Sequence, residues 1–371
     1  MKLSATLIVR DEAAVLARCL VRIRDAVDEI VVVDTGSTDA TPAIARRLAD
    51  RVCHFRWVDD FAAARQHALE QARGSWLFWL DADDIVHGAA GLRTLATQAP
   101  DDLAGYRLRY DYAHDDAGQA TCRLWRERLV RAGAGWRWQG RVHEVLVAAG
   151  GGRLVDTDAV TIEHRPPPGR GAAKAGRNLR LLELERAGGR DDARLHFYLG
   201  AEYTAAGRDS DAVAAYEACI ERSAWRDEQV LALLALARLH RDGGRWAQAA
   251  AADEQACAAC PDWPMPWFGL AADAFGRADW AAVLRHCDRG RACPAPDTPH
   301  IVNPLQIRFD WLLHYTHALW HLARADEALA WTRHALAICP ADPWHRQNYF
   351  LFAAHARPPR RAAATPGAFH G

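Results

Sequence analysis

Residues 75–84 read Ser-Trp-Leu-Phe-Trp-Leu-Asp-Ala-Asp-Asp, an apolar run that ends abruptly in three carboxylates. The run is short, rich in aromatic residues and preceded by a glycine, which predicts a buried strand. Asp81, Asp83 and Asp84 then follow the C-terminal end of that strand, where open α/β sheets place their ligands. Carboxylates this close repel one another unless a cation lies between them, and a hard divalent metal that carries a phosphate fits best. The alternative is a solvated acidic turn.

The residues before this stretch alternate between strand and helix patterns. Strands are expected at 3–9, 29–34 and 52–58, and helices at 13–26, 43–49 and 61–73. This alternation predicts a parallel sheet with helices on both faces. Acids follow three of the strands, at Asp11, at Asp34 and at Asp81 with Asp83. Because a parallel sheet brings the C-terminal ends of its strands to one edge, we expect these acids to meet there.

Beyond Asp84 the pattern is less regular. Segments 123–126 and 136–138 are basic and aromatic, and further strands are expected at 106–112 and 154–162. His164 comes just after the last of these strands. Three prolines and a glycine at 166–169 then break the chain. We therefore predict an α/β domain over residues 1–168.

Residues 169–356 are expected to form an all-α domain of helical repeats. A Gly-Arg or Ala-Arg pair begins at 207, 244, 276 and 323, and each pair has an alanine five positions after its first residue. These alanines, expected where paired helices cross, are Ala212, Ala249, Ala281 and Ala328. The pattern resembles tetratricopeptide repeats, which stack into a solenoid with a concave groove. The tail, 357–371, is rich in Pro, Arg and Ala and is expected to be disordered.

Composition excludes several classes of protein. A net charge of -1 over 371 residues carries no signal for nucleic acid. Nine cysteines in a chain of this size suggest reduced thiols in a cytoplasmic protein and no disulfide framework. The N-terminus lacks the long apolar region of a signal peptide, and no run reaches the length of a membrane span. A peripheral association with the inner membrane stays open.

Four segments together resemble family 2 glycosyltransferases of the GT-A fold, at 7–12, 28–41, 61–65 and 76–84. Segments 141–144 and 163–164 resemble later motifs of one subgroup, whose members often carry tetratricopeptide repeats downstream. That subgroup includes lipopolysaccharide-core glucosyltransferases and peptide S-glycosyltransferases. The chain departs from the family pattern at Asp11 and Gln66, where Asn is usual, and at Asp84, where Glu is usual. The resemblance implies a Rossmann-like, mostly parallel sheet followed by a tetratricopeptide-like solenoid.

The resemblance also implies an activity, the inverting transfer of a hexose from a nucleoside-diphosphate sugar, expected to be a UDP-sugar. Asp81, Asp83 and His164 would hold Mg²⁺ or Mn²⁺ on the diphosphate. The residues expected to bind the donor are Asp11, Glu12, Asp34, Gly36, Ser37, Asp39, Arg65 and Asp81. The acceptor would be a glycan or a peptide, held by the repeats, which could otherwise mediate a homodimer.

Several residues have a second interpretation. Ser37 or Thr38 could be the N-cap of the next helix. Arg65 could lie on a solvated face instead of clamping a phosphate, and a histidine that ends a strand, such as His164, is often structural. An inverting transfer needs a general base, for which Glu144 is the candidate and Asp84 the alternative.

Two other functions compete with transfer. One is an inactive scaffold that keeps the fold and binds proteins, against which the intact carboxylates argue. The other is a nucleotidyltransferase, which would need a Gly-rich basic loop after the first strand, and residues 10–12 (Arg-Asp-Glu) are not such a loop. Cys257 and Cys260 have the spacing of metal ligands but lack a second pair, so we interpret them as core residues.

Overall fold

The structure of the protein is a computed structural model that describes residues 1–115, 118–167, 171–296, 298 and 302–356. The chain divides into two compact units, Met1–Cys260 with Pro296–Pro304, and Pro261–Ala295 with Leu305–Gly371. The expected boundary at residue 168 and the expected disordered tail fall outside the described residues, so both stay predictions. Over the described ranges, no helix combines the length and the apolar character that crossing a membrane requires.

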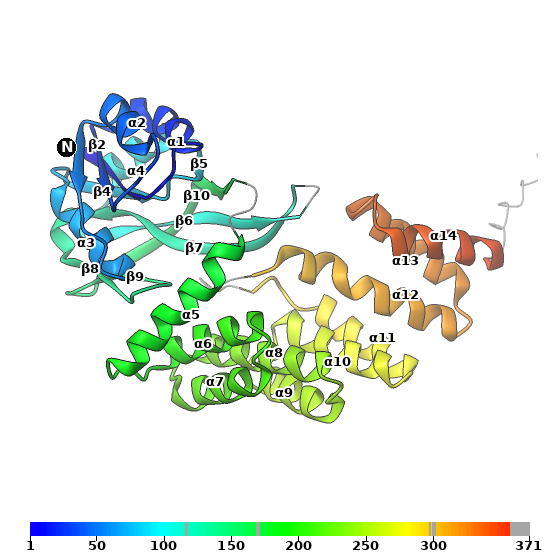
Figure 1. Cartoon of the computed structure of the whole chain (residues 1–371). Helices are drawn as coiled ribbons and strands as arrows, with labels where there is room; N and C mark the ends of the chain where they lie inside the picture. The colour runs from blue at the N-terminus through cyan, green and yellow to red at the C-terminus, as the bar shows by residue number, and fades with distance from the viewer. Residues whose placement is uncertain (116–117, 168–170, 297, 299–301, 357–371) are drawn as a thin grey trace, which may run out of the picture. The chain divides into compact units, whose positions relative to one another are not determined.

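Among its described residues, the first unit has a sheet of eight strands, which are β1 (Leu3–Val9), β2 (Glu29–Asp34), β3 (Arg51–His54), β4 (Trp76–Leu80), β5 (Asp84–His87), β6 (Leu103–His114), β7 (Ala120–Arg131) and β10 (Arg153–His164). Their order is β3-β2-β1-β4-β7-β6-β10-β5 (Figure 1). The first four in this order run parallel, as predicted. β7 is antiparallel to both of its neighbours, and so is β5 to β10, which makes the whole sheet mixed.

Helices and a hairpin cover the two faces of this sheet. One face packs against α1 (Leu16–Ile23), α2 (Thr41–Leu48) and α4 (Gly91–Gln98). The other face packs against α3 (Phe61–Gln71) and the small hairpin of β8 (Trp136–Gln139) and β9 (Val145–Ala148) (Figure 1). Helices on both faces confirm the α/β prediction for this part of the chain.

β4 is the central strand that the sequence predicts. Its five residues are all buried, because Phe78 and Leu80 enter the core beneath α1 while Leu77 and Trp79 enter the core beneath α3. A strand buried on both faces reads as a continuous apolar run. Its C-terminal end therefore delivers Asp81 to the edge of the sheet from a rigid support.

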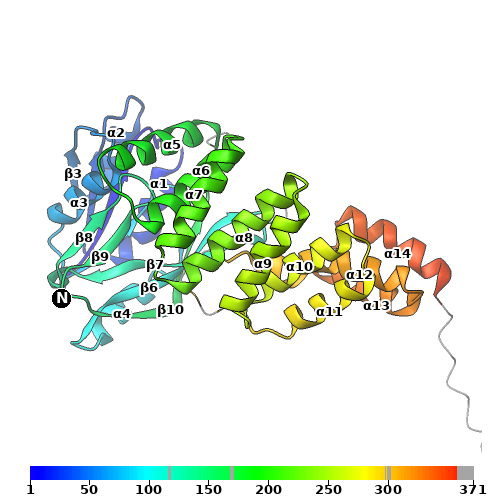
Figure 2. The same ribbon diagram turned by 90° about the horizontal axis from the view of Figure 1, so that it is seen from below.

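The remainder of the first unit is helical. Its helices are α5 (Gly171–Ala187), α6 (Ala193–Ala205), α7 (Asp209–Arg222), α8 (Arg226–Asp242) and α9 (Trp246–Ala259). α6 and α7 form an antiparallel pair, which Figure 2 shows side by side. α5 to α8 enclose a common apolar cluster that includes Leu182, Leu199 and Leu236. The predicted all-helical repeats are therefore present.

The second unit continues the repeats with α10 (Pro264–Gly276), α11 (Trp280–Arg291), α12 (Trp311–His321), α13 (Ala325–Ile338) and α14 (Pro343–His355). The left-handed residues in the turns between paired helices are Gly207, Gly244, Ala278 and Ala323. Ala278 lies two positions after Gly276, where the turn was expected. The prediction that Ala281 lies at a helix crossing is therefore wrong, since Ala281 is exposed and Val283 is fully buried. The other three predicted alanines are fully buried.

Candidate metal centre

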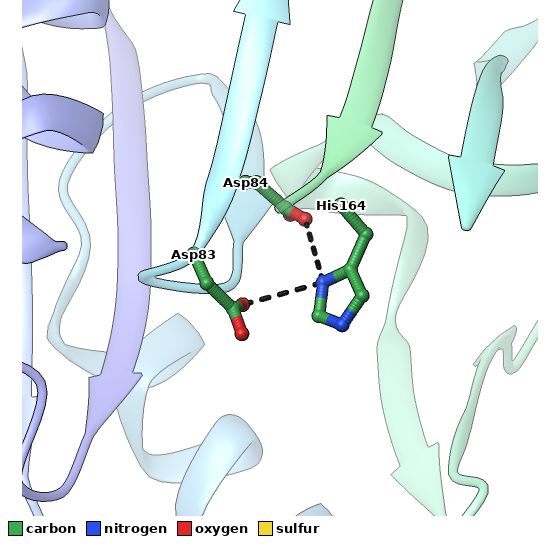
Figure 3. A group of neighbouring side chains, drawn as sticks. All are labelled: Asp83, Asp84 and His164. Atoms are coloured by element: carbon green, nitrogen blue, oxygen red, sulfur yellow. Dashed lines mark ion pairs between the residues drawn. The ribbon is translucent and has the colours of Figure 1, made fainter. Parts of the chain in front are cut away.

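Asp83, Asp84 and His164 converge at the edge of the sheet beyond β4 (Figure 3). One ligand atom from each residue lies within 4.8 Å of the other two. The imidazole Nδ1 of His164 lies 3.4 Å from Oδ1 of Asp83 and 3.7 Å from Oδ1 of Asp84. All three residues are buried. The geometry presents two carboxylates and one imidazole to a common point.

Local backbone pairing creates this arrangement. Residues 81–84 form a tight turn in which the backbone N–H of Asp84 donates to the carbonyl of Asp81 at 3.1 Å. β5 then starts at once and pairs with the end of β10, where His164 lies opposite Asp84. The N–H of Arg165 donates to the carbonyl of Asp83 at 2.9 Å. Segments 80 residues apart are thus joined at the site by sheet pairing.

The charge of the two carboxylates acts on His164. Burial lowers the pKa of this imidazole, but the Asp83 and Asp84 carboxylates outweigh burial and raise the pKa to about 9. Tyr112 of β6 stacks on the ring, with centroids 4.9 Å apart and planes within 6°. Nδ1 of His164 is buried, and among the described residues it neither donates nor accepts a hydrogen bond. That nitrogen is the expected ligand atom for a cation.

Asp84 is held by Arg128, a residue that the sequence interpretation missed. The Arg128 guanidinium is fully buried between the rings of Trp79 and Tyr110, 3.7 and 4.4 Å from their centroids. It donates to Oδ2 of Asp84 at 3.0 Å, and the Tyr110 hydroxyl donates to Oδ1 at 3.0 Å. The available signal was the basic and aromatic segment that becomes β7. With zero exposure, Asp84 is placed better to organise the turn than to act as a general base.

Arg65 links two of the predicted residues. It is buried on α3 and donates from Nη2 to Oδ1 of Asp81 and from Nε to Oε1 of Glu144, at 2.5 Å in each case. Its guanidinium also lies over the rings of Trp79 and Trp138. Burial raises the pKa of Asp81, but the charge of Arg65 outweighs it and holds that pKa well below its usual range. Arg65 therefore does not lie on a solvated face.

A second set of predicted residues surrounds the ends of β1 and β2. Oδ1 of Asp34 accepts from the backbone and hydroxyl of Ser37, at 3.1 and 2.5 Å. Oδ1 of Asp11 accepts from the backbone N–H of Thr38 at 2.7 Å, which lowers the pKa of Asp11. Gly36 has a φ of 107°, a conformation that L side chains rarely adopt. These bonds fix the two loops to each other at the same edge of the sheet as β4.

The start of α2 corrects one prediction. Its N-cap residue is Ala40, so neither Ser37 nor Thr38 caps the helix. Asp39 connects the two loops instead, because it accepts from the N–H groups of Thr41 at 2.8 Å and of Ala13 at 3.1 Å. The N–H of Glu12 donates to the Thr41 hydroxyl at 2.7 Å. The predicted donor-binding roles of Glu12 and Asp39 stay predictions.

The N-terminal part of the chain is similar to a known family of enzymes. Residues 4–127 match the model of glycosyl transferase family 2. This confirms the resemblance predicted from the sequence over the segment that holds Asp81, Asp83 and Asp84. His164 and Glu144 lie outside the matched residues.

Two curated relatives cover parts of the chain. A TPR repeat-containing protein of Synechococcus elongatus is 40% identical over 169 residues, which are 45% of this chain and 38% of that protein. The lipopolysaccharide core biosynthesis glycosyltransferase LpsC of Rhizobium meliloti is 32% identical over 165 residues, 40% of this chain and 58% of that protein. The chain thus spans less than two thirds of the length of each.

Solved structures resemble the chain less closely. The crystal structure of the APC/C hetero-tetramer Cut9–Hcn1 is 15% identical in sequence and aligns with a TM-score of 0.40. The alignment covers 50% of this chain and 34% of the matched chain. At this score the likeness supports no further conclusion.

Proposed function

We propose that the chain is an inverting glycosyltransferase that moves a hexose from a nucleoside-diphosphate sugar, a UDP-sugar, to a glycan or peptide acceptor. The observation that carries the proposal is the buried cluster of Asp83, Asp84 and His164 at the end of β4, in which the two aspartates belong to the segment that matches family 2. Crowded buried carboxylates are costly unless a cation or a hydrogen-bond network compensates them. Their position beyond a parallel strand is where α/β sheets bind nucleotides.

The side chains of this cluster fit a divalent metal. Carboxylate oxygens suit Mg²⁺ and Mn²⁺, and an imidazole nitrogen adds affinity for Mn²⁺. We propose Asp83 and His164 as ligands, with Asp84 completing the cluster from its fixed position. The sequence also predicts Asp81 as a metal ligand. Its Oδ1 already accepts a hydrogen bond from Arg65, so Asp81 would coordinate the metal through Oδ2. A bound ion would neutralise the charge of the departing diphosphate.

The chain's own residues would then carry the transfer. The acceptor hydroxyl or thiol attacks the anomeric carbon, the bond from that carbon to the diphosphate oxygen breaks, and a base takes the acceptor proton. We propose Glu144 as this base. Arg65 donates to its Oε1, which leaves Oε2 as the oxygen that would take the proton.

The loops after β1 and β2 are proposed to hold the nucleotide. Asp34 is buried at its strand end and is oriented by Ser37, so its carboxylate is placed to accept from a base or a ribose. Asp11 and Asp39 connect the two loops, and the absence of a side chain at Gly36 lets the backbone approach a ligand closely. Arg65 would contact the phosphates from the other side of β1.

The relatives inform the acceptor and the setting. The name of LpsC, which concerns lipopolysaccharide core biosynthesis, favours a glycan acceptor, and the repeats would hold the acceptor or a partner protein. A homodimer through the repeats is an alternative use of the same helices. None of the nine cysteines, each of which lies in the described part of the chain, forms a disulfide. Reduced cysteines fit the cytoplasm, where we place the protein.

Donor hydrolysis tests the proposal. The protein is incubated with a panel of nucleoside-diphosphate sugars and Mn²⁺, and release of the nucleoside diphosphate is measured. We expect release with a UDP-sugar, its loss on addition of EDTA and its loss in Asp83→Ala. Asp101→Ala, which removes an exposed acid from the same unit, is the matched control and should keep the activity. No release with any donor would favour the scaffold, and equal release from the wild type and Asp83→Ala would remove Asp83 from the site of reaction.

A further inference from the structure

Residues 141–144 join the sheet to the first repeat helices. The backbone N–H of Arg141 donates to the Glu185 carboxylate on α5. The side chain of Val142 is buried in the apolar cluster of α5 to α8. Glu144 points the other way, to Arg65 on α3. The short segment therefore has contacts with the repeats at one end and with the candidate site at the other.

His143 lies between these contacts and is held by α6. Its ring stacks on Tyr198 with centroids 4.0 Å apart and planes within 2°. Its Nε2 lies 3.4 Å from Oε1 of Glu202, and its carbonyl accepts from Nη2 of Arg194 at 3.1 Å. The three α6 residues are spaced by four, which puts them on one face of the helix. We name them the α6 stripe.

His143 has an unusual backbone conformation, which these contacts stabilise. Its φ is 51°, in the left-handed region that residues with a side chain adopt uncommonly. Such a conformation persists only where the surroundings hold it. The ring stack on Tyr198, the hydrogen bond with Glu202 and the bond from Arg194 to the carbonyl hold His143 in this conformation. Glu144 is the next residue, so the conformation of His143 sets the direction in which Glu144 leaves the turn.

We propose that the α6 stripe (Arg194, Tyr198 and Glu202) positions Glu144 against Arg65. The first repeat then contributes to the geometry of the candidate site. The consequence for turnover rests on the proposed function, in which Glu144 takes the acceptor proton. The stripe touches no reacting atom and acts through His143. The repeats would then be required for chemistry as well as for binding a partner or acceptor.

Hydrogen–deuterium exchange of the full chain tests the structural part directly. In Tyr198→Ala and in Glu202→Gln we expect faster exchange over residues 139–146, with α7 to α9 as protected as in the wild type. Glu221→Gln is the matched control, since it removes an exposed carboxylate from the neighbouring α7 and leaves His143 untouched. Unchanged exchange over residues 139–146 in both stripe variants would overturn the proposal.

Turnover of a UDP-sugar with Mn²⁺ tests the consequence. Misplacement of a catalytic group by about 1 Å costs up to about a hundredfold, so we expect kcat to fall between about tenfold and a hundredfold in Tyr198→Ala, with little change in the donor KM. Tyr198→Phe keeps the ring and should recover most of the loss, which a general loss of folding would not allow. Unaltered kcat in Tyr198→Ala would overturn the positioning role while the transferase proposal stands. A wild type that turns over no donor refutes the transferase proposal, and the exchange measurement still decides whether α6 holds the segment.

Discussion

Arg65 and Glu144, 79 positions apart in the sequence, form a buried ion pair in which Nε lies 2.5 Å from Oε1. The same guanidinium also bonds to Asp81 at 2.5 Å, so one cation satisfies two carboxylates from different segments. The pair thus connects α3, the end of β4 and the segment that precedes β9. Its geometry decides how the candidate metal centre and the proposed base are placed relative to each other.

Replacement of Arg65 by Met should destabilise the protein strongly. The change leaves the buried Glu144 and the part-buried Asp81 without their shared cation, which costs about 3–5 kcal/mol of unfolding free energy. Urea unfolding of the full chain, followed by tryptophan fluorescence, measures the loss. Arg153→Met is the matched control, because its pair with Asp102 is exposed and should contribute less than about 1 kcal/mol. Similar losses in the two variants would contradict this account of the buried network.

Replacement of His164 by Ala should weaken Mn²⁺ binding. The change removes the imidazole nitrogen from the cluster with Asp83 and Asp84, and we expect the affinity to fall about tenfold or more. Titration of Mn²⁺ followed by electron paramagnetic resonance measures it without any donor. His87→Ala, at an exposed imidazole on the paired strand β5, is the control and should bind as the wild type does. If both variants bind Mn²⁺ equally well, the ion lies elsewhere.

Replacement of Glu144 by Gln should lower kcat and spare donor binding. Loss of a general base typically costs about 10²–10⁴ in rate, while the amide oxygen still accepts from Arg65. Initial rates with a UDP-sugar and titration of UDP give the two quantities separately. Glu70→Gln changes an exposed acid on α3 and is expected to leave both unchanged. A kcat within a few fold of the wild type would remove Glu144 from the role of base and leave it only as a partner of Arg65.

The ion pair of Asp59 and Arg180 should appear in the acid dependence of stability. Hydrogen bonds from Arg180, at 2.7 and 3.0 Å, are the main cause that lowers the pKa of Asp59 to about 2. Because the folded pKa lies below the ordinary value near 4, the pair stabilises the fold above pH 4 and loses this effect as the pH falls from 4 to 2. The melting temperature of Arg180→Met should therefore lie below that of the wild type at pH 6, and the two should converge toward pH 2.

The control for this measurement is Arg238→Met. Arg238 and Asp242 are both largely exposed and lie 3.8 Å apart, so this pair contributes little. Its melting curve should follow the wild type at every pH. A difference between Arg180→Met and the wild type that does not change with pH would assign the effect of Arg180 to packing.

Local patterns predicted the parallel half of the sheet well. β1 and β2 have the expected bounds, and β4 lies within the apolar run that predicted it, because short apolar runs buried on both faces carry their signal in their own residues. The antiparallel half was predicted less completely. β7 went unrecognised, since its residues do not alternate between buried and exposed positions. β6 and β10 are each longer than expected.

The candidate site divides in the same way. The chain order alone indicated that Asp11, Asp34 and Asp83 follow strands of a parallel sheet, because strand direction and the crossover rule bring such ends to one edge. Which groups then pair with them depends on contacts between segments far apart in the chain, and no local pattern encodes these. Arg128 on Asp84, Arg65 between Asp81 and Glu144, and the α6 residues on His143 are visible only in the folded chain. Because an unpaired buried charge is costly, each of these charges needs a partner, and only the tertiary structure decides which residue that partner is.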